Sequence, residues 1–290
     1  MQPSTIAQWL SHGTAALTPG SGSARLDAQI LLALSMDTSR AFLFAWPDSK
    51  ISAAQSDAFA DLIERRAGGE PVNYITGRKE FWSVELAVTP DTLIPRPDTE
   101  RLVELALEHI PQKREVTIAD IGTGSGAIAI ALALERPLCR VFATDVSDAC
   151  VTLARHNIAR LDIPNIEVHQ GDLFAPLDDM LFDVVISNPP YIRDDDPHLN
   201  EGDVRFEPRL ALTGGADGLD VIKRLLVTTG GYLHDGGTVL IEHSHDQGGS
   251  VRALCAEAGL HNANTFRDYG GRERVTIAHG SVTHSSVTHS

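Results

Sequence analysis

The chain has 290 residues, enough for two domains with separate cores, and its 42% hydrophobic and 22% charged residues are ordinary for a globular protein. Its net charge is −15; residues 86–290 hold thirty acids and seventeen bases, a balance of −13 that weighs against binding the phosphates of nucleic acid. The three cysteines are too few and too scattered for a disulfide framework, and there is no cationic leader or membrane-length apolar stretch. We therefore expect a cytoplasmic protein without structural zinc or membrane contact.

The N-terminal part shows the periodicity of helices. Apolar residues recur at helical spacing in residues 24–36 and 52–66, where Ser52 is the expected N-cap, and glycine, proline and serine separate these segments. We predict a small all-helical domain over residues 1–80. Because it has no catalytic motif, it would either recognise a protein substrate, which we favour, or only complete the fold. Residues 81–97 are predicted to be a linker containing a β-hairpin between 81–88 and 92–94.

Helices and strands alternate from residue 98 onward, which favours a parallel sheet with helices on both faces. Near the end, residues 263–267 and 274–278 flank a Tyr-Gly-Gly turn and are predicted to form a hairpin. We assign residues 98–279 to a second, catalytic domain. Residues 280–290 are polar and repeat Ser, Val, Thr and His, so we expect a disordered tail there.

A glycine-rich loop separates a predicted strand at 116–119 from a predicted helix at 127–134. In this strand–loop–helix order the backbone passes close beneath a nucleotide-like ligand. The spacing is G-x-G-x-G and the loop holds no Lys or Arg, which favours a ligand without phosphates. The candidate ligand-binding residues are Asp120, which could receive an ammonium group, and Gly122, Thr123, Gly124, Ser125 and Gly126.

Further candidates follow the next two predicted strands. Asp145 ends one strand and is well placed to accept two ribose hydroxyls, and Asp172 and Phe174 follow the other strand and could border an adenine. Taken singly, each acid would more often be an ordinary loop carboxylate. The ordered set at successive strand ends instead fits S-adenosylmethionine, which has an amino-acid end, a ribose with both hydroxyls free and an adenine.

The tetrapeptide Asn188-Pro189-Pro190-Tyr191 follows an apolar, strand-like run. An amide or arylamine nitrogen is a poor nucleophile, and a site can help it by accepting both of its N–H groups, here with the Asn188 side-chain oxygen and the Pro189 carbonyl. Tyr191 offers a flat face for stacking. Alone, these residues could be a simple turn; with the glycine loop upstream, we assign Asn188, Pro189 and Tyr191 to catalysis and all four residues to substrate binding. Asn188 could also touch the cofactor.

Other polar residues have less definite roles. His243 and His245 have no acidic or cysteine partner at ligand spacing, so we predict loop residues and no metal. Glu242 could orient a backbone or substrate group, and the sequence does not decide between them. The candidates for the walls of a substrate channel are Arg96, Asp98, Glu100 and Glu207.

Four of these segments occur together in one known family. The motifs D-I-G-T-G-S-G at 120–126, N-P-P-Y at 188–191, I-P-R-P-D-T-E at 94–100 and R-D-Y-G at 267–270 resemble those of the bacterial release-factor glutamine methyltransferases. The resemblance covers nearly the whole chain. It implies an α/β, Rossmann-like methyltransferase sheet that depends on S-adenosylmethionine, ends in an antiparallel hairpin and follows a small helical domain.

The resemblance also implies the reaction. The methyl group would pass from S-adenosyl-L-methionine, leaving S-adenosyl-L-homocysteine, to the side-chain amide nitrogen of the glutamine in the Gly-Gly-Gln motif of peptide-chain release factors, in support of translation termination. The alternative is a nucleic-acid methyltransferase acting on the exocyclic amine of adenine or cytosine, which would share the fold and the tetrapeptide. The acidic charge favours the first function, so we expect a monomer that has release factors as partners and does not bind nucleic acid directly.

Overall fold

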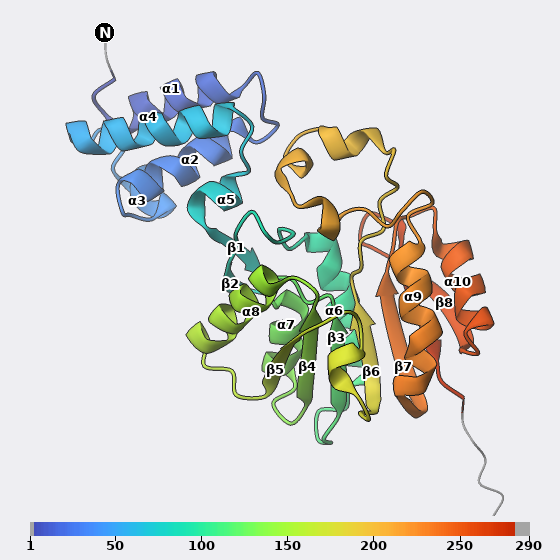
Figure 1. The fold of residues 1–290 in the computed structure, drawn as a ribbon. Coiled ribbons are helices and arrows are strands. Elements are labelled where there is room, and N and C mark those ends of the chain that lie inside the picture. The colour runs from blue at the N-terminus through green and yellow to red at the C-terminus, as the bar shows by residue number, and fades with distance from the viewer. Residues whose placement is uncertain (1–2, 282–290) are drawn as a thin grey trace, which may run out of the picture. The chain divides into compact units, whose positions relative to one another are not determined.

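The computed structural model describes residues 3–281, which divide into two compact units (Figure 1). One unit contains the chain up to Arg78 together with Pro197–Phe206, and the other contains Lys79–Asp196 and the chain from Glu207 onward. Most of the predicted tail, residues 282–290, lies outside the described residues. No helix within residues 3–281 is both long enough and apolar enough to cross a membrane.

The first unit is helical, as its periodicity predicts. Thr5 and Ser52 cap two of its helices in capping boxes with Gln8 and Gln55, so the predicted N-cap at Ser52 is confirmed. Buried apolar residues that include Leu31 join the helices in one core. The helices are α1 (Ile6–Leu17), α2 (Ala24–Ser35), α3 (Arg40–Ala45), α4 (Ala53–Ala67) and α5 (Val72–Thr76).

The segment Pro197–Phe206 belongs to this helical unit, although the sequence analysis placed it in the catalytic domain. It contains two short 3-10 helices, η2 (Pro197–Asn200) and η3 (Val204–Phe206). The buried Arg66 guanidinium explains the grouping, because it binds both Asp27 and Asp203 at 2.8 Å. These ion pairs join positions far apart in the chain, which local patterns do not reveal.

The predicted hairpin between 81–88 and 92–94 is wrong in its pairing. The structure instead pairs β1 (Arg78–Phe81) with β2 (Val84–Ala87), and residues 92–94 form no strand. The chain reverses direction between the two strands at Trp82 and Ser83, which both have positive φ (52° and 57°). Tight hairpins need this conformation but normally signal it with Gly or Asn, so the sequence carried no sign of the turn.

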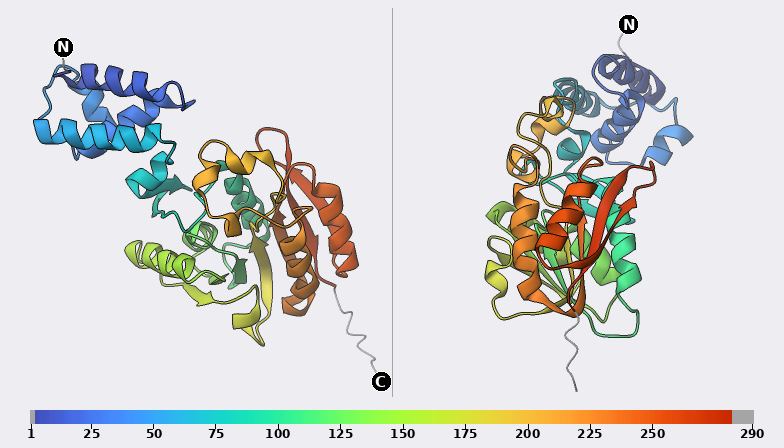
Figure 2. Two further views of the ribbon diagram at one scale, coloured as in Figure 1. Left: turned by 45° about the horizontal axis from the view of Figure 1, so that its top comes forward. Right: turned by 90° about the vertical axis from the view of Figure 1, so that its right-hand side faces the viewer.

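The second unit is built on a seven-stranded sheet in the order β5-β4-β3-β6-β7-β9-β8 (Figure 1). The first five strands are parallel, and β9 is antiparallel to both of its neighbours, which confirms the predicted C-terminal hairpin at the sheet edge (Figure 2). The strands are β3 (Thr117–Ile121), β4 (Arg140–Asp145), β5 (Ile166–Gln170), β6 (Phe182–Ser187), β7 (Leu233–Glu242), β8 (His261–Arg267) and β9 (Glu273–His279).

Successive strand residues enter different cores. Ile118 and Ile186 pack with helices α6 to α8, whereas their neighbours Ala119 and Val185 pack with α9 and α10. This alternation buries both faces of the sheet, which explains why its strands are nearly continuous apolar runs. The helices are α6 (Pro97–His109), α7 (Ala127–Glu135), α8 (Asp148–Arg160), α9 (Asp220–Thr229) and α10 (Gly248–Glu257); the remaining 3-10 turns are η1 (Ala175–Leu177), η4 (Arg209–Ala211) and η5 (Gly230–Tyr232).

The strand order reverses at β3. From β3 the chain passes outward to β4 and β5, and it then returns to β6 on the other side of β3. In open α/β sheets the crevice at such a switch point, outside the carboxyl ends of the strands, is the usual ligand site. Here the glycine loop, Asp145 and Asn188 leave the ends of β3, β4 and β6, so they meet at that edge.

Candidate active site

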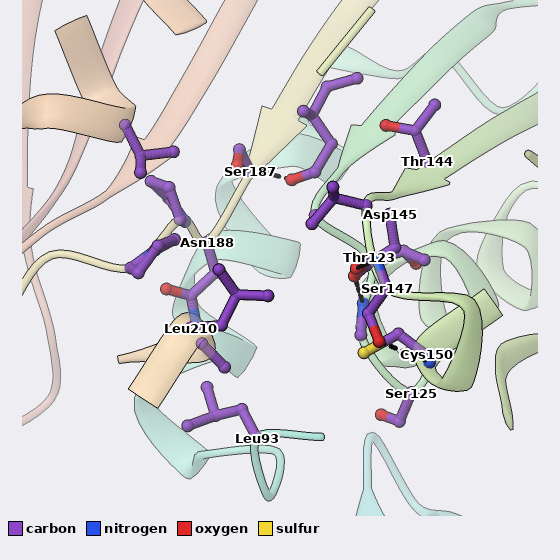
Figure 3. Close-up of a pocket in the computed structure, with 18 of the residues that line it drawn as sticks. Leu93, Thr123, Ser125, Thr144, Asp145, Ser147, Cys150, Ser187, Asn188 and Leu210 are labelled. Atoms are coloured by element: carbon purple, nitrogen blue, oxygen red, sulfur yellow. Dashed lines mark hydrogen bonds between the residues drawn. The ribbon is translucent and has the colours of Figure 1, made fainter. Parts of the chain in front are cut away.

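A cavity of about 390 Å³ lies at the switch point, within the second unit. In Figure 3, Asn188 and Leu210 lie on one wall, and Thr123, Asp145, Ser147 and Cys150 lie across the cavity from them. The volume falls in the range of sites for small molecules and cofactors. Both predicted motifs therefore border one space.

The glycine loop leaves open space beside its backbone. Gly122 and Gly124 have φ of +77° and +57°, and a Cβ atom at either position would meet no protein atom within 4 Å. Both glycines line the cavity with Thr123 and Ser125, so a ligand can approach the backbone directly. Gly126 has φ +85° but does not line the cavity; its α-carbon faces Ala154, 3.4 Å from where a Cβ would lie.

Asp120, predicted to receive an ammonium group, is fully buried and does not line the cavity. Its Oδ2 accepts hydrogen bonds from the Thr123 hydroxyl (2.6 Å) and the Ala129 backbone N–H (3.2 Å). Oδ1 has no hydrogen-bond partner among the described residues. Burial raises the pKa of Asp120 to about 7, whereas the two hydrogen bonds lower it. Asp120 therefore supports the loop from within the protein.

Asp145 lines the cavity, as expected for a ligand-binding acid. Its Oδ2 accepts the Gly124 N–H at 2.9 Å, and its Oδ1 accepts the Ser147 N–H at 2.9 Å. Each carboxylate oxygen keeps a further lone pair for a ligand hydroxyl. Asp145 thus ties the glycine loop to the start of α8 and presents a fixed acceptor to the cavity.

Asp172 and Phe174 separate in the structure. Asp172 lines the cavity and forms an ion pair with Arg224, which also lines it. Phe174 is buried and stacks on Tyr232, with ring centroids 4.4 Å apart, so the structure does not bring it to the cavity wall, where it was predicted to border an adenine. The reason is the backbone at Leu173: with φ +51°, Leu173 itself lines the cavity, and Phe174 packs into the core.

The Asn188-Pro189-Pro190 segment lines the cavity opposite the glycine loop (Figure 3). The Asn188 Nδ2 donates a hydrogen bond to Thr99 Oγ1 at 3.1 Å, and no hydrogen bond within residues 3–281 reaches the side-chain oxygen. That oxygen is therefore free to accept from a ligand. Tyr191 does not line the cavity; it is half-buried, and its hydroxyl donates to Glu242 Oε1 at 3.1 Å.

Residues distant in the chain brace this tetrapeptide. Gln247 Nε2 donates to the Tyr191 carbonyl at 3.0 Å, and Gly218 approaches that carbonyl so closely that a Cβ would lie 2.3 Å from it. Together with Thr99, these supporting residues were not identified from the sequence. Gln247 and Gly218 belong to no predicted motif, and the 94–100 motif that contains Thr99 does not reveal its partner, so only the folded chain brings these residues to the strand end.

The proposed channel residues divide into two groups. Arg96 lines the cavity and forms an ion pair with the buried Glu207, which does not line it and whose other oxygen accepts the Ile94 N–H at 3.1 Å. Glu207 thereby holds the segment before α6 in place. Asp98 and Glu100 do not line the cavity: Asp98 pairs with Arg274 at 3.5 Å, and Glu100 accepts the Trp82 N–H at 3.0 Å.

His243 is fully buried beside this region. Its Nε2 contacts Thr276 Oγ1 at 2.8 Å and its Nδ1 contacts the Ser244 carbonyl at 2.8 Å, so both ring nitrogens have protein partners. Burial lowers its pKa. Within the described part of the chain, no group of three or more His, Cys, Asp or Glu side chains could hold a metal ion.

Two family models match this chain: the PrmC N-terminal domain over residues 8–77 and the methyltransferase small domain over residues 101–202. The release factor glutamine methyltransferase of Pseudomonas aeruginosa is 49% identical over 89% of this chain and 94% of its own length. That of Escherichia coli is 44% identical over 93% of this chain and 96% of its own. Among solved structures, a methyltransferase from Pyrococcus furiosus shares the fold, with a TM-score of 0.52, 20% identity and coverage of 68% of this chain and 89% of that one.

Proposed function

Since the chain belongs to the family of release factor glutamine methyltransferases, we propose that it methylates the side-chain amide nitrogen of the glutamine in the Gly-Gly-Gln motif of peptide-chain release factors. The observation that carries the proposal is the pose of Asn188. Its amide N–H binds Thr99, and its oxygen accepts no hydrogen bond within residues 3–281, so a residue of the cavity wall keeps an unused acceptor. A site for a primary amide needs such an acceptor.

We propose S-adenosylmethionine as the methyl donor, because the wall across from Asn188 fits it. Open space beside Gly122 and Gly124 admits a ligand close to the backbone, and Asp145 offers a carboxylate to hydroxyl groups. The two arginines that line the cavity, Arg96 and Arg224, are each paired with a carboxylate, so neither presents an uncompensated charge to a phosphate. When bound, this donor supplies an activated methyl group, since a neutral sulfide leaves as the methyl group is transferred.

The residues of the chain would act mainly by alignment. The Asn188 side-chain oxygen and the Pro189 carbonyl would accept the two N–H groups of the target amide and aim its nitrogen at the methyl group. These hydrogen bonds strengthen as the nitrogen gains positive charge, so they favour the transition state over the bound substrate. Pro190, which lines the cavity, would complete the substrate-binding wall, and Tyr191 would support that wall from behind. The nitrogen can release its proton after methyl transfer, so no strong base is required.

We assign recognition of the release factor to the helical N-terminal domain. It has no catalytic motif, and a family model separate from that of the methyltransferase matches it. Release factors act on ribosomes, so we place the reaction in the cytoplasm, with a monomeric enzyme and no direct contact with nucleic acid. No observation on the site favours the alternative of nucleic-acid methylation.

The decisive experiment is mass spectrometry of a release factor after incubation with the enzyme and S-adenosylmethionine. We expect one added methyl group on the peptide that contains Gly-Gly-Gln, and none when that glutamine is replaced by alanine. Parallel incubations with DNA and RNA test the alternative. Methylation of nucleic acid together with an unmodified release factor would refute the proposed function.

A further inference from the structure

Glu242, the last residue of β7, is a buried carboxylate that has no assigned role. It is 1% exposed, its Oε1 accepts the Tyr191 hydroxyl at 3.1 Å, and its Oε2 has no hydrogen-bond partner among the described residues. A buried carboxylate oxygen without a partner is costly and rare in folded proteins. Packing alone would be served as well by an apolar side chain, which suggests that the carboxylate is kept for its chemistry.

Three elements place polar groups around this carboxylate. Helix α6 contributes Asp98 and the Thr99 hydroxyl, β9 contributes Arg274, and the segment after β6 contributes Tyr191. Burial raises the pKa of Glu242 to about 7; Thr99, Arg274 and Tyr191 lower it, and Asp98 raises it. Glu242 is therefore balanced between its charged and neutral forms near neutral pH.

Thr99 connects Glu242 to the site. It is buried on the first turn of α6, it lines the cavity, and its Oγ1 accepts the Asn188 N–H at 3.1 Å. The hydroxyl therefore keeps its own hydrogen for another acceptor. Glu242 is close enough for hydrogen bonding from Thr99 to lower its pKa, although Oε2 has no partner with full hydrogen-bond geometry. The series of hydrogen bonds requires the Thr99 hydroxyl to donate to the unpaired Glu242 Oε2.

The direction of these hydrogen bonds matters because an asparagine side chain has two ends of nearly equal shape. With its oxygen towards the cavity, Asn188 accepts from the target amide; turned over, it would present N–H groups to N–H groups. A carboxylate can only accept, so it makes the Thr99 hydroxyl donate to it. Thr99 must then accept from Asn188, which holds the Asn188 oxygen towards the cavity.

We propose that Glu242 is a positioning residue that acts through Thr99 to keep the Asn188 oxygen facing the glutamine substrate. This inference rests on the proposed function. It assigns to Glu242 no contact with the substrate and no proton transfer. It predicts that the ionised form is the active one, so turnover should rise as the pH rises through about 7.

The test compares four variants of the full-length enzyme by their kcat and KM for an intact release factor. Glu242→Gln can donate to Thr99 and Thr99→Val removes the hydroxyl, so each should lower kcat roughly 10- to 100-fold while KM changes less than about 3-fold. Thr99→Ser restores the hydroxyl and should retain most of the turnover. Thr229→Val removes a buried hydroxyl that bonds the Leu225 carbonyl away from the cavity, and it should be neutral.

Two further readouts separate positioning from a loss of structure. The rise of kcat with pH should disappear in Glu242→Gln, and the double variant Glu242→Gln/Thr99→Val should be no slower than the slower single variant, because both act through one series of hydrogen bonds. Normal turnover in Thr99→Val, or an unchanged pH profile in Glu242→Gln, would overturn the inference and leave the proposed function intact. A wild-type enzyme that does not methylate the release factor would refute both the inference about Glu242 and the proposed function.

Discussion

The two walls of the cavity are held in different ways. Across from Asn188, Asp145 accepts backbone N–H groups from Gly124 and Ser147, and the loop conformation depends on glycines with positive φ. The Asn188 wall instead depends on side chains, through Thr99, Glu242 and Tyr191. A wall built from backbone keeps its shape under most side-chain substitutions, whereas a wall built from side chains changes when one member changes.

This difference assigns a separate task to each wall. The glycine-loop wall should determine how tightly the methyl donor binds, because its contacts exist before the reaction begins. The Asn188 wall should determine turnover, because its acceptors meet a nitrogen whose charge grows during the reaction. Substitutions in the two walls should therefore affect different kinetic constants.

The largest effect is expected at Asn188. Asn188→Ala should lower kcat by about 100-fold or more, whereas the affinity for the release factor falls far less, because the lost hydrogen bond strengthens only in the transition state. Asn188→Asp still offers an acceptor and should keep more activity than the alanine variant. Single-turnover rates with binding measured separately will show the difference. Near-normal turnover in Asn188→Ala, or an Asp variant slower than the Ala variant, would show that Asn188 is not the acceptor and that the tetrapeptide is only a turn.

At Asp145, across the cavity, we expect an effect of similar size on the affinity for S-adenosylmethionine instead of on turnover. A carboxylate that accepts two hydroxyls contributes on the order of 2–3 kcal/mol, so Asp145→Ala should weaken S-adenosylmethionine binding by roughly 30- to 150-fold. Turnover at saturating donor should change little. Calorimetry measures the affinity, and Asp148→Ala is a matched control, because Asp148 is exposed and does not line the cavity. Equal affinities for the wild type and a folded Asp145→Ala variant would exclude the ribose role.

The same contrast explains which parts of the site could be predicted. The glycine loop, Asp145 and Asn188 each follow a buried strand directly, so local pattern and strand order were enough to bring them together. Thr99 lies 89 positions from Asn188, and Gln247 lies 56 positions from Tyr191. No local pattern pairs such distant residues, and only the folded chain brings them together.

Two differences between prediction and structure have local physical causes. Phe174 was expected at the cavity because it follows a strand end, but the left-handed backbone at Leu173 turns it into the core. The hairpin was misplaced because Trp82 and Ser83 make a turn that usually needs glycine or asparagine. In both places a residue other than glycine adopts positive φ, which composition and periodicity do not reveal.

A smaller effect is expected in the helical unit. Phe44 and Trp46 are 56% and 58% exposed there, and large exposed aromatic residues are typical anchors of protein interfaces. Replacing both with alanine should raise KM for an intact release factor by roughly 10-fold and leave KM for a short Gly-Gly-Gln peptide unchanged. Val227, 77% exposed in the other unit, provides a control as Val227→Ala. An equal loss with the peptide would show that the helical unit supports the fold instead of recognition.

Point substitutions test this role better than deletion of the helical domain. Arg66 and Gly68 hold the segment Pro197–Phe206 through Asp203 and Arg205, so removing the N-terminal residues would also release that segment. A truncated enzyme would then lose two structures at once. Substitutions at Phe44 and Trp46 leave these contacts unchanged.

Each wall of the cavity is supported by one buried acid, and the two acids should also affect the stability of the protein. Asp120 supports the glycine loop, Glu242 supports the Asn188 wall, and burial raises the pKa of each to about 7. A raised pKa means that the folded state binds the proton more tightly than the unfolded chain, in which these groups titrate near pH 4. Each protonated acid therefore stabilises the folded state fully below about pH 4, and this contribution is lost as the pH rises through about 7.

The free energy of unfolding should accordingly fall by about 2–3 kcal/mol per acid between pH 5 and pH 8. Asp120→Asn and Glu242→Gln should each reduce that fall, and the double variant should show the flattest profile, as measured by urea denaturation at the two pH values. The functional outcomes should differ, because Asp120→Asn still accepts from Thr123 and keeps turnover, whereas Glu242→Gln loses it. If both variants kept the wild-type slope, neither acid would be the titrating group, and the low-pH loss of turnover would need another origin.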